Sequence, residues 1–185
     1  MKIAAQKKLV QRTREVVGWR ELVGLPDFNI AEMRAKIDTG ARTSALHAEN
    51  QELFERAGQK WVRFKFPVRR PAPDLLLEAQ VIDERNIKNT GGVPERRLII
   101  RTTLLLGRHR WKIEVSLADR KKMEFDLILG RTALRSRRVL VNPSSSFVMG
   151  RPLSKLSAGS TADHSPRDKT RPPNGDYVFQ QRRKP

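Results

Sequence analysis

The hydrophobic pattern of this chain is one of short strands. Between residues 15 and 151, runs of β-branched and aliphatic residues are interrupted by turn residues about every ten positions, which is typical of a β-sandwich or barrel. Only residues 132–136 suggest a helix, and that segment is brief. The pattern predicts nine strands, at residues 15–25, 33–37, 44–53, 60–68, 75–83, 97–106, 110–117, 125–129 and 139–141.

Two connections between these strands have a recognisable character. Residues 107–110, Gly-Arg-His-Arg, are expected to form a hairpin turn. Residues 86–95 lack apolar anchors and read either as an ordinary surface loop or as a lid over a site. In the second case Gly91 and Gly92 are candidate substrate contacts.

The chain ends differ from its middle. Ser, Pro, Gly and charged residues dominate from Arg151 onward, and no apolar period survives there. We therefore expect a flexible basic N-terminus at residues 1–15, one domain at 16–151 and a disordered tail at 152–185.

The composition indicates which stabilising features and which cellular compartment to expect for the domain. The chain of 185 residues has no cysteine, which excludes a disulfide framework and thiolate metal sites. Its early apolar run, Ile3-Ala4-Ala5, is too short for a secretory signal, and no segment is long enough to span a membrane. We expect a cytoplasmic protein.

The net charge of +18 predicts anionic partners, because a strong positive field attracts them. Residues 152–185 contribute only +4 of this charge, which leaves +14 on residues 1–151. A basic folded body indicates an anion-binding groove more than a basic nucleic-acid arm.

A single acidic residue, Asp38, occupies a tight turn after an apolar-flanked run, in the sequence Ala-Lys-Ile-Asp-Thr-Gly-Ala at residues 35–41. We expect Gly40 to bend the backbone with a positive φ, and the Thr39 hydroxyl to lock the turn. A carboxylate held in this way is suited to general acid or base catalysis. Asp-Thr-Gly alone is also common as a plain turn with a solvated acid.

A second signal lies at residues 125–134, where an apolar strand ends in Gly-Arg and turns into a short helix. An apolar strand ending in Asp-Thr-Gly-Ala, then several strands, then this segment resembles the retroviral-type aspartic proteases, the retropepsins, over about residues 20–151. Residues 38–48, 129–134 and 141–144 are more specifically similar to the bacterial retropepsin-like family often labelled "ATP-dependent zinc protease". Members of that family are associated with an ATP-grasp ligase that adds glutamates to a ribosomal protein, and its RimB-type members are implicated in the same system.

This resemblance implies an all-β, closed acid-protease barrel with one short helix and a pair of catalytic carboxylates. Two adjacent carboxylates share one proton, so that one serves as base while the other donates a proton. The chain has one Asp-Thr-Gly, so the pair is either Asp38 from each subunit of a homodimer or Asp38 with another acid in a monomer. The implied catalytic residues are Asp38, Thr39 and Gly40, and the implied substrate-binding residues are Ala41, Arg42, Thr43, His47 and Arg131.

One departure from the viral pattern bears on the substrate. Viral retropepsins usually place an acid after the Asp-Thr-Gly-Ala turn to pair with the arginine of the Gly-Arg segment, whereas Arg42 and Thr43 follow here, so Arg131 loses that partner. Arg42 then either binds acidic substrate side chains or pairs with Asp126 or Glu124 to hold the fold.

The sequence does not support a cofactor. Neither a His-Glu-x-x-His motif nor a cysteine is present, and His47, His109 and His164 are scattered, so the residues do not indicate zinc. Residues 40–46 lack the Gly-Lys-Ser/Thr ending of a phosphate loop, so ATP dependence could not come from this chain. His47 is more easily read as a structural hydrogen-bonding group than as a proton shuttle.

The leading hypothesis is an aspartic endopeptidase that cleaves acidic or glutamate-rich segments, such as a glutamylated ribosomal-protein tail. One alternative is a non-catalytic module of the same fold that regulates a glutamate ligase. Another is a ribosome- or RNA-binding protein, in which Trp61, Phe64 and Phe66 interleave with basic residues, although that segment also fits an ordinary alternating strand.

Overall fold

The computed structural model describes residues 14–67, 73–88, 92–135 and 137–153. All of them belong to the first of two units, Met1–Lys155 and Leu156–Pro185. The expected flexible N-terminus and disordered tail lie almost wholly outside the described residues, so the domain boundaries stay predictions. The elements are β1 (Val16–Leu25), a 3-10 turn η1 (Pro26–Phe28), β2 (Ile30–Ile37), β3 (Ser44–His47), β4 (Glu49–Arg56), β5 (Gln59–Phe66), β6 (Leu75–Lys88), β7 (Pro94–Leu106), β8 (His109–Ala118), β9 (Leu127–Leu129), α1 (Arg131–Arg135) and β10 (Leu140–Ser146).

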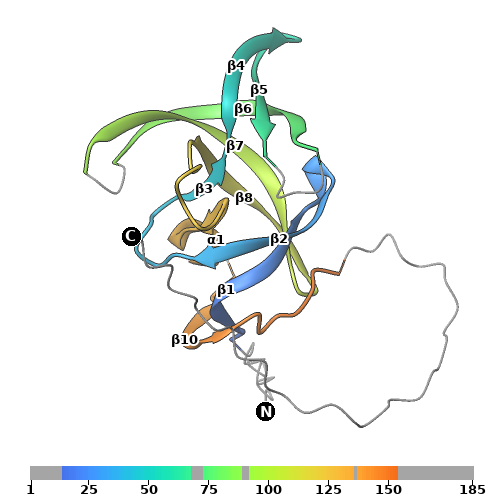
Figure 1. Cartoon of the computed structure of the whole chain (residues 1–185), viewed down its shortest axis with the longest axis vertical. Coiled ribbons are helices and arrows are strands. Elements are labelled where there is room, and N and C mark those ends of the chain that lie inside the picture. The colour runs from blue at the N-terminus through green and yellow to red at the C-terminus, as the bar shows by residue number, and fades with distance from the viewer. Residues whose placement is uncertain (1–13, 68–72, 89–91, 136, 154–185) are drawn as a thin grey trace, which may run out of the picture. The chain divides into compact units, whose positions relative to one another are not determined.

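Six of these strands close on themselves (Figure 1). The order β1-β2-β9-β3-β8-β7 returns to its start because Val23 and Gly24 of β1 pair with Leu106 and Leu105 of β7. Strand β10 continues the sheet beside β1, and β6, β5 and β4 extend it from β7. The described part of the chain is thus an all-β closed barrel with one short α-helix, as the sequence predicts.

The barrel core forms from apolar residues at alternate positions of these strands, because successive side chains of a strand point to opposite faces. In β5, Val62, Phe64 and Phe66 are buried, while Arg63 between them is exposed. Two of the three aromatic residues of the RNA-binding alternative are therefore core residues, and only Trp61 is partly exposed. The fully or almost fully buried core residues of the barrel include Val17, Val23, Leu25, Ala35, Leu46, Leu104, Leu106, Val115, Leu117, Leu127 and Leu129.

The single strand predicted at residues 44–53 is wrong, because the chain changes partners within it. Strand β3 lies inside the barrel between β8 and β9, whereas β4 pairs with β5 and is last in the order of the described sheet. The two strands separate at Ala48, and Asn50 adopts a left-handed conformation with φ of 49°. Asn tolerates that conformation better than most residues, and Asn50 lies where the register between β4 and β5 shifts, between Glu49 and Glu52.

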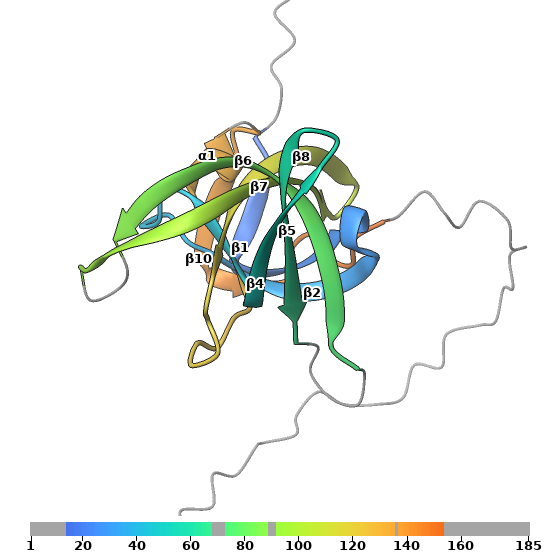
Figure 2. The same cartoon turned by 90° about the horizontal axis from the view of Figure 1, so that it is seen from above.

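Strands β6 and β7 form a longer hairpin than the hydrophobic pattern of the sequence predicts. Asn86 pairs with Arg96 and Lys88 with Pro94, so residues 86–88 and 94–95 of the expected loop are strand. The backbones of β6 and β7 stay paired here although neither strand has an apolar face at this end, so the apolar pattern of the sequence does not reveal these strand ends. Figure 2 shows the paired ends of β6 and β7 reaching beyond the barrel strands.

The two expected turn regions have different outcomes. The hairpin turn at residues 107–110 is confirmed, because β7 ends at Leu106, β8 begins at His109, and Gly107 between them has φ of 53°. Gly92 has φ of 79° near the tip of the β6–β7 hairpin. Gly91 lies outside the described residues.

Candidate active site

Two parallel strands bring the Asp38 turn and the Gly-Arg segment together. Strands β2 and β9 run side by side with Ile37 opposite Leu129, so both strands end at the same edge of the barrel. The Asp38 N–H donates to the Leu129 carbonyl over 2.9 Å. The two motifs that carry the family resemblance are therefore one structural unit.

The Asp38 carboxylate is held by backbone donors of its own turn. Its Oδ1 accepts hydrogen bonds from the N–H groups of Gly40 at 3.0 Å and Ala41 at 3.1 Å. The expectation of a positive φ at Gly40 is wrong. Instead, a Cβ atom at this position would lie 3.2 Å from Asp38 Oδ1, which is tighter than ordinary contact, so glycine leaves room for the carboxylate.

The side chain of Thr39 does not lock the turn as expected. It is exposed and forms no hydrogen bond with any described residue. Arg131 holds the turn in place instead, because its Nη1 donates to the carbonyl oxygens of Thr39 and Gly40, each over 2.8 Å. The Arg131 N–H also donates to the Ala41 carbonyl at 2.9 Å. Arg131 thus braces the outside of the turn and has no acidic partner among the described residues.

Gly130 explains why the Gly-Arg segment begins with glycine. A Cβ atom here would lie 2.6 Å from the carbonyl carbon of Thr43 and 2.9 Å from the Ser44 nitrogen. The Gly130 N–H donates to the buried Ser44 hydroxyl at 3.1 Å. Close backbone approach, with no positive φ, is what requires glycine.

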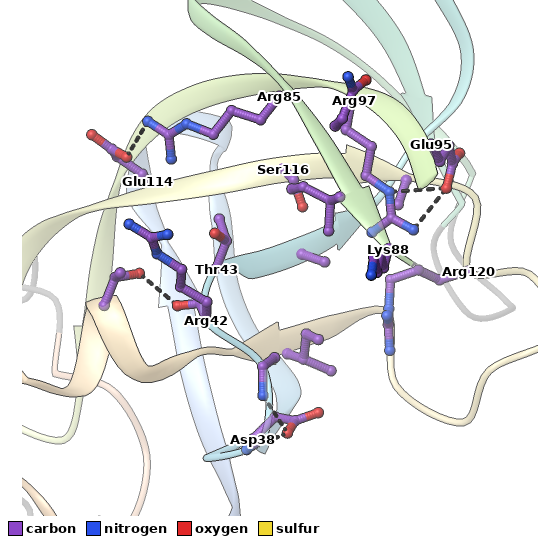
Figure 3. A pocket seen from close by; sticks show the side chains of 18 of the residues that line it. Asp38, Arg42, Thr43, Arg85, Lys88, Glu95, Arg97, Glu114, Ser116 and Arg120 are labelled. Atoms are coloured by element: carbon purple, nitrogen blue, oxygen red, sulfur yellow. Dashed lines mark hydrogen bonds and ion pairs between the residues drawn. The ribbon is translucent and has the colours of Figure 1, made fainter. Parts of the chain in front are cut away.

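Asp38 lies at the floor of a cavity of about 1110 Å³ (Figure 3). The hairpin formed by β6 and β7 contributes the opposite wall. Of the residues predicted from the sequence, those that line this cavity are Asp38, Gly40, Ala41, Arg42 and Thr43. Those that do not line it are Thr39, His47, Gly92 and Arg131.

His47 lies behind the cavity wall. It is buried, and its Nδ1 accepts a hydrogen bond from the Arg120 N–H at 2.9 Å, while its Nε2 lies 3.5 Å from Glu49. The Arg120 side chain in turn donates from Nε to the Phe125 carbonyl at 2.9 Å and lines the cavity. His47 therefore has the structural role considered for it, and it positions Arg120.

The cavity walls contain more positive charge than the sequence motifs indicated. Two lining cations are neutralised: Arg85 pairs with Glu114 at 2.9 Å and Arg97 pairs with Glu95 at 2.7 Å.

Three further lining cations, Arg42, Lys88 and Arg120, form no ion pair with any described residue. The alternative in which Arg42 pairs with Asp126 or Glu124 is therefore wrong for the described part of the chain. Burial, followed by the neighbouring Arg97, lowers the pKa of Arg120, although a guanidinium remains charged. Figure 3 shows Arg97 and Arg120 converging on one end of the cavity above Asp38.

Sequence reasoning missed these wall residues for a topological reason. Arg120 follows β8, and β8 is parallel to β3, so its end meets the end of β3 at His47. Parallel pairing between strands so far apart in the chain leaves no local signal. Arg97 is only 12% exposed, but charged residues precede it at the start of β7, so the local sequence does not mark it as buried.

Neither a metal nor a membrane helix is indicated in the described residues. Within them, no group of three or more His, Cys, Asp or Glu side chains could hold a metal ion. No helix of that part of the chain has the length and apolar character that a bilayer crossing requires.

Comparison with known proteins gives consistent matches. Residues 16–152 match the family model RimB-like, described as retropepsin-like aspartic endopeptidase RimB. A probable alpha-L-glutamate ligase from Shewanella halifaxensis is 39% identical over 137 residues, which are 73% of this chain and 30% of the relative. A protein of the same name from Desulfotalea psychrophila is 36% identical over 148 residues, covering 79% and 32%. The chain thus spans about a third of the length of these curated relatives.

A solved structure supports the same fold. The crystal structure of a protein of unknown function from Legionella pneumophila matches with a TM-score of 0.65 and 28% sequence identity. The match covers 74% of this chain and 99% of that one.

Proposed function

The chain belongs to the RimB-like family of retropepsin-like proteins, and from that premise we propose that it is a cytoplasmic aspartic-type endopeptidase acting on acidic peptide segments. The observation that carries the proposal is the Asp38 carboxylate, fixed by two backbone N–H groups at the floor of a large cavity. A fixed carboxylate open to a cavity can reach a bound water and a peptide carbonyl together.

In the proposed reaction, the Asp38 carboxylate removes a proton from water as the water oxygen attacks the scissile carbonyl. A second carboxylic acid donates its proton to the carbonyl oxygen, which gives a tetrahedral intermediate. The carbon–nitrogen bond then breaks as the departing nitrogen takes up a proton, and the products are a new carboxylate and a new amine. Because two neighbouring carboxylates cannot both ionise cheaply, the pair holds one proton and supplies both roles.

Two sources for the second acid stay open within the proposal. One is Asp38 of a second copy of the chain, which requires a symmetric dimer. The other is Asp119, which lines the same cavity but is 73% exposed and accepts the Lys121 N–H at 2.9 Å.

The unpaired cations of the cavity favour acidic substrates. The Arg42, Lys88 and Arg120 side chains line the same space as Asp38, and none of them forms an ion pair with a described residue, although Asp126 and Asp38 attract Arg120 from a longer distance. Guanidinium groups bind carboxylates bidentately. A chain of glutamates would supply the missing partners, and this is the class of peptide we propose, including a glutamylated protein tail.

A glutamate ligase is the partner we propose. The matching segments of the Shewanella and Desulfotalea proteins belong to longer chains named probable alpha-L-glutamate ligases. A hydrolase for glutamate-rich segments would oppose such a ligase. The competing proposal is that the chain only binds and regulates the ligase. It predicts a ligase complex and no peptide product.

The test is cleavage of synthetic oligoglutamate and of a neutral oligoglutamine control, followed by liquid chromatography from acidic to neutral pH. We expect wild-type protein to cut oligoglutamate and Asp38→Asn to lose at least about a thousandfold in rate, because the general base is removed. Equal thermal unfolding of the two proteins controls for folding. Retained cleavage by Asp38→Asn would refute the proposal.

A further inference from the structure

We propose that a surface of arginines beside the cavity binds the part of a long acidic peptide that extends out of the active site. This inference rests on the proposed function and adds a second binding region to it. We call this surface the arginine track, and it consists of Arg14, Arg42, Arg131, Arg135 and Arg138.

The arginine track is continuous with the Asp38 cavity. Arg42 lines that cavity and also a neighbouring hollow of about 540 Å³ with Arg131 and Arg135. Arg131 and Arg135 line a second hollow of about 500 Å³, which they share with Arg14 and Arg138. Arg14, Arg135 and Arg138 also line a third, of about 590 Å³. Hollows that share side chains adjoin, so a chain leaving the cavity at Arg42 meets arginine at each step.

The local structure places these arginines side by side. Arg135 ends the short helix α1, and the Arg138 N–H donates to the Arg135 carbonyl at 3.2 Å in the turn that follows. Arg138 has a left-handed φ of 53° within this turn. Both side chains are exposed, so their guanidinium groups are available to a ligand.

The charge of the arginine track is not neutralised by the described part of the chain. Arg14, Arg135 and Arg138 form no ion pair with any described residue. The one carboxylate that lines the third hollow, Glu15, lies 2.5 Å from His109 Nε2 and 3.5 Å from Arg108. Adjacent like charges cost free energy, and a polyanionic ligand would relieve that cost.

The chemistry favours a carboxylate chain over RNA. Sequence-tolerant binding of single-stranded RNA uses aromatic faces on which bases stack. Trp111 is the aromatic residue that lines the third hollow, but its Nε1 donates to the Ala133 carbonyl at 3.2 Å, and Arg137 covers its ring at 5.4 Å from the centroid. The surface therefore offers guanidinium groups without a free stacking platform.

The geometry predicts a preference for long substrates. A peptide of about four glutamates spans roughly 14 Å when extended, and one of about sixteen spans more than 50 Å. The short peptide fills the cavity alone, whereas the long one also reaches the arginine track. Each exposed charge pair contributes modestly, so removing two arginines should cost about three- to tenfold in affinity for the long peptide.

The experiment compares fluorescent oligoglutamates of these two lengths in the full chain. Binding is measured by anisotropy in an Asp38→Asn background, and cleavage is measured with Asp38 intact. The test variant is Arg135→Gln with Arg138→Gln. Arg34→Gln with Lys122→Gln is the matched control, since both residues are exposed, carry the same total charge and lie off the track.

We expect the test variant to lose three- to tenfold of its preference for the long peptide over the short, with the control pair keeping that preference. If the test pair unfolds, Arg14→Gln with Arg138→Gln supplies a variant that leaves α1 intact. An unchanged length preference would overturn the inference even if wild-type protein cleaves both peptides. Tighter binding of oligouridine than of oligoglutamate of the same length would overturn it in favour of RNA. Equal rates of cleavage by wild type and Asp38→Asn would instead count against the proposed function.

Discussion

At the scale of single residues, Asp38 is the position whose environment the sequence described best. The tight turn and the fixed carboxylate were predictable, because an acid followed by small residues after an apolar run has few other local structures. The roles of its neighbours were not. Gly40 makes room for Asp38 Oδ1 rather than adopting a positive φ, and Arg131 rather than Thr39 braces the turn.

Arg42 provides a prediction about substrate charge. Replacing Arg42 by Gln should raise the KM for oligoglutamate about fivefold, because a bidentate carboxylate contact in a partly solvated cavity is lost. The effect on oligoglutamine should be within twofold. Steady-state kinetics on the two peptides measures this, with Arg34→Gln as an exposed arginine outside the cavity. An equal change in KM for both peptides would show that Arg42 does not recognise the charge of the substrate.

At the scale of elements, the sequence predicted strand positions but not which strands are neighbours. Apolar periodicity located most of the barrel strands, and it joined β3 and β4 because the change of partners at Ala48 leaves no gap in the pattern. The site walls depend on long-range pairing. His47 and Arg120 meet only because β3 and β8 are parallel, and that information is not local to either strand.

The contact between the two motif segments gives a stability prediction. Gly130→Ala should lower the free energy of unfolding by about 2–4 kcal/mol, since the new Cβ would overlap the backbone of Thr43 and Ser44. Gly58→Ala is the matched control. Gly58 has φ of 70° and open space around it, so only about 1 kcal/mol of backbone strain is expected there. Urea unfolding measures both, and equal losses would contradict the packing explanation.

A second prediction at this scale concerns the connection of η1 to β7. Asp27 accepts hydrogen bonds from the Thr103 N–H at 2.8 Å and from Lys112 at 2.9 Å. Burial raises the pKa of Asp27, but hydrogen bonds from Lys112 and Thr103 outweigh it, so the pKa is lowered from the ordinary value of 3.8.

Because folding weakens proton binding at Asp27, its contribution to stability is present above pH 3.8 and is lost as the pH falls through the lowered value. Asp27→Asn should therefore be less stable than wild type at pH 6, by about 1 kcal/mol, and the difference should shrink in acid. Thermal unfolding across this pH range checks the prediction. A difference that stays constant or grows toward low pH would contradict it.

At the scale of the whole molecule, net charge predicted an anionic ligand but not where it binds. In the described structure, the unpaired cations that line hollows near Asp38 divide between the Asp38 cavity and the arginine track, with Arg42 in both. Composition cannot make that division, because it depends on which arginines have carboxylate partners. Composition also does not identify the second catalytic carboxylate, because one chain contains a single Asp-Thr-Gly.

The source of the second acid gives the prediction at this scale. We expect Asp119→Asn to retain at least about half of the wild-type rate, because the exposed Asp119 carboxylate is engaged by the Lys121 N–H. The specific activity of wild-type protein should then rise with protein concentration, as two copies combine their Asp38 residues. Loss of activity in Asp119→Asn, with a specific activity independent of concentration, would identify Asp119 as the in-chain partner.

The most direct test of the central claim is hydrolysis of oligoglutamate in heavy-oxygen water, followed by mass spectrometry of the products. The account predicts that wild-type protein places a single heavy oxygen in each new carboxylate during one turnover, and that folded Asp38→Asn forms no product. Product formation by Asp38→Asn at the wild-type rate would contradict it.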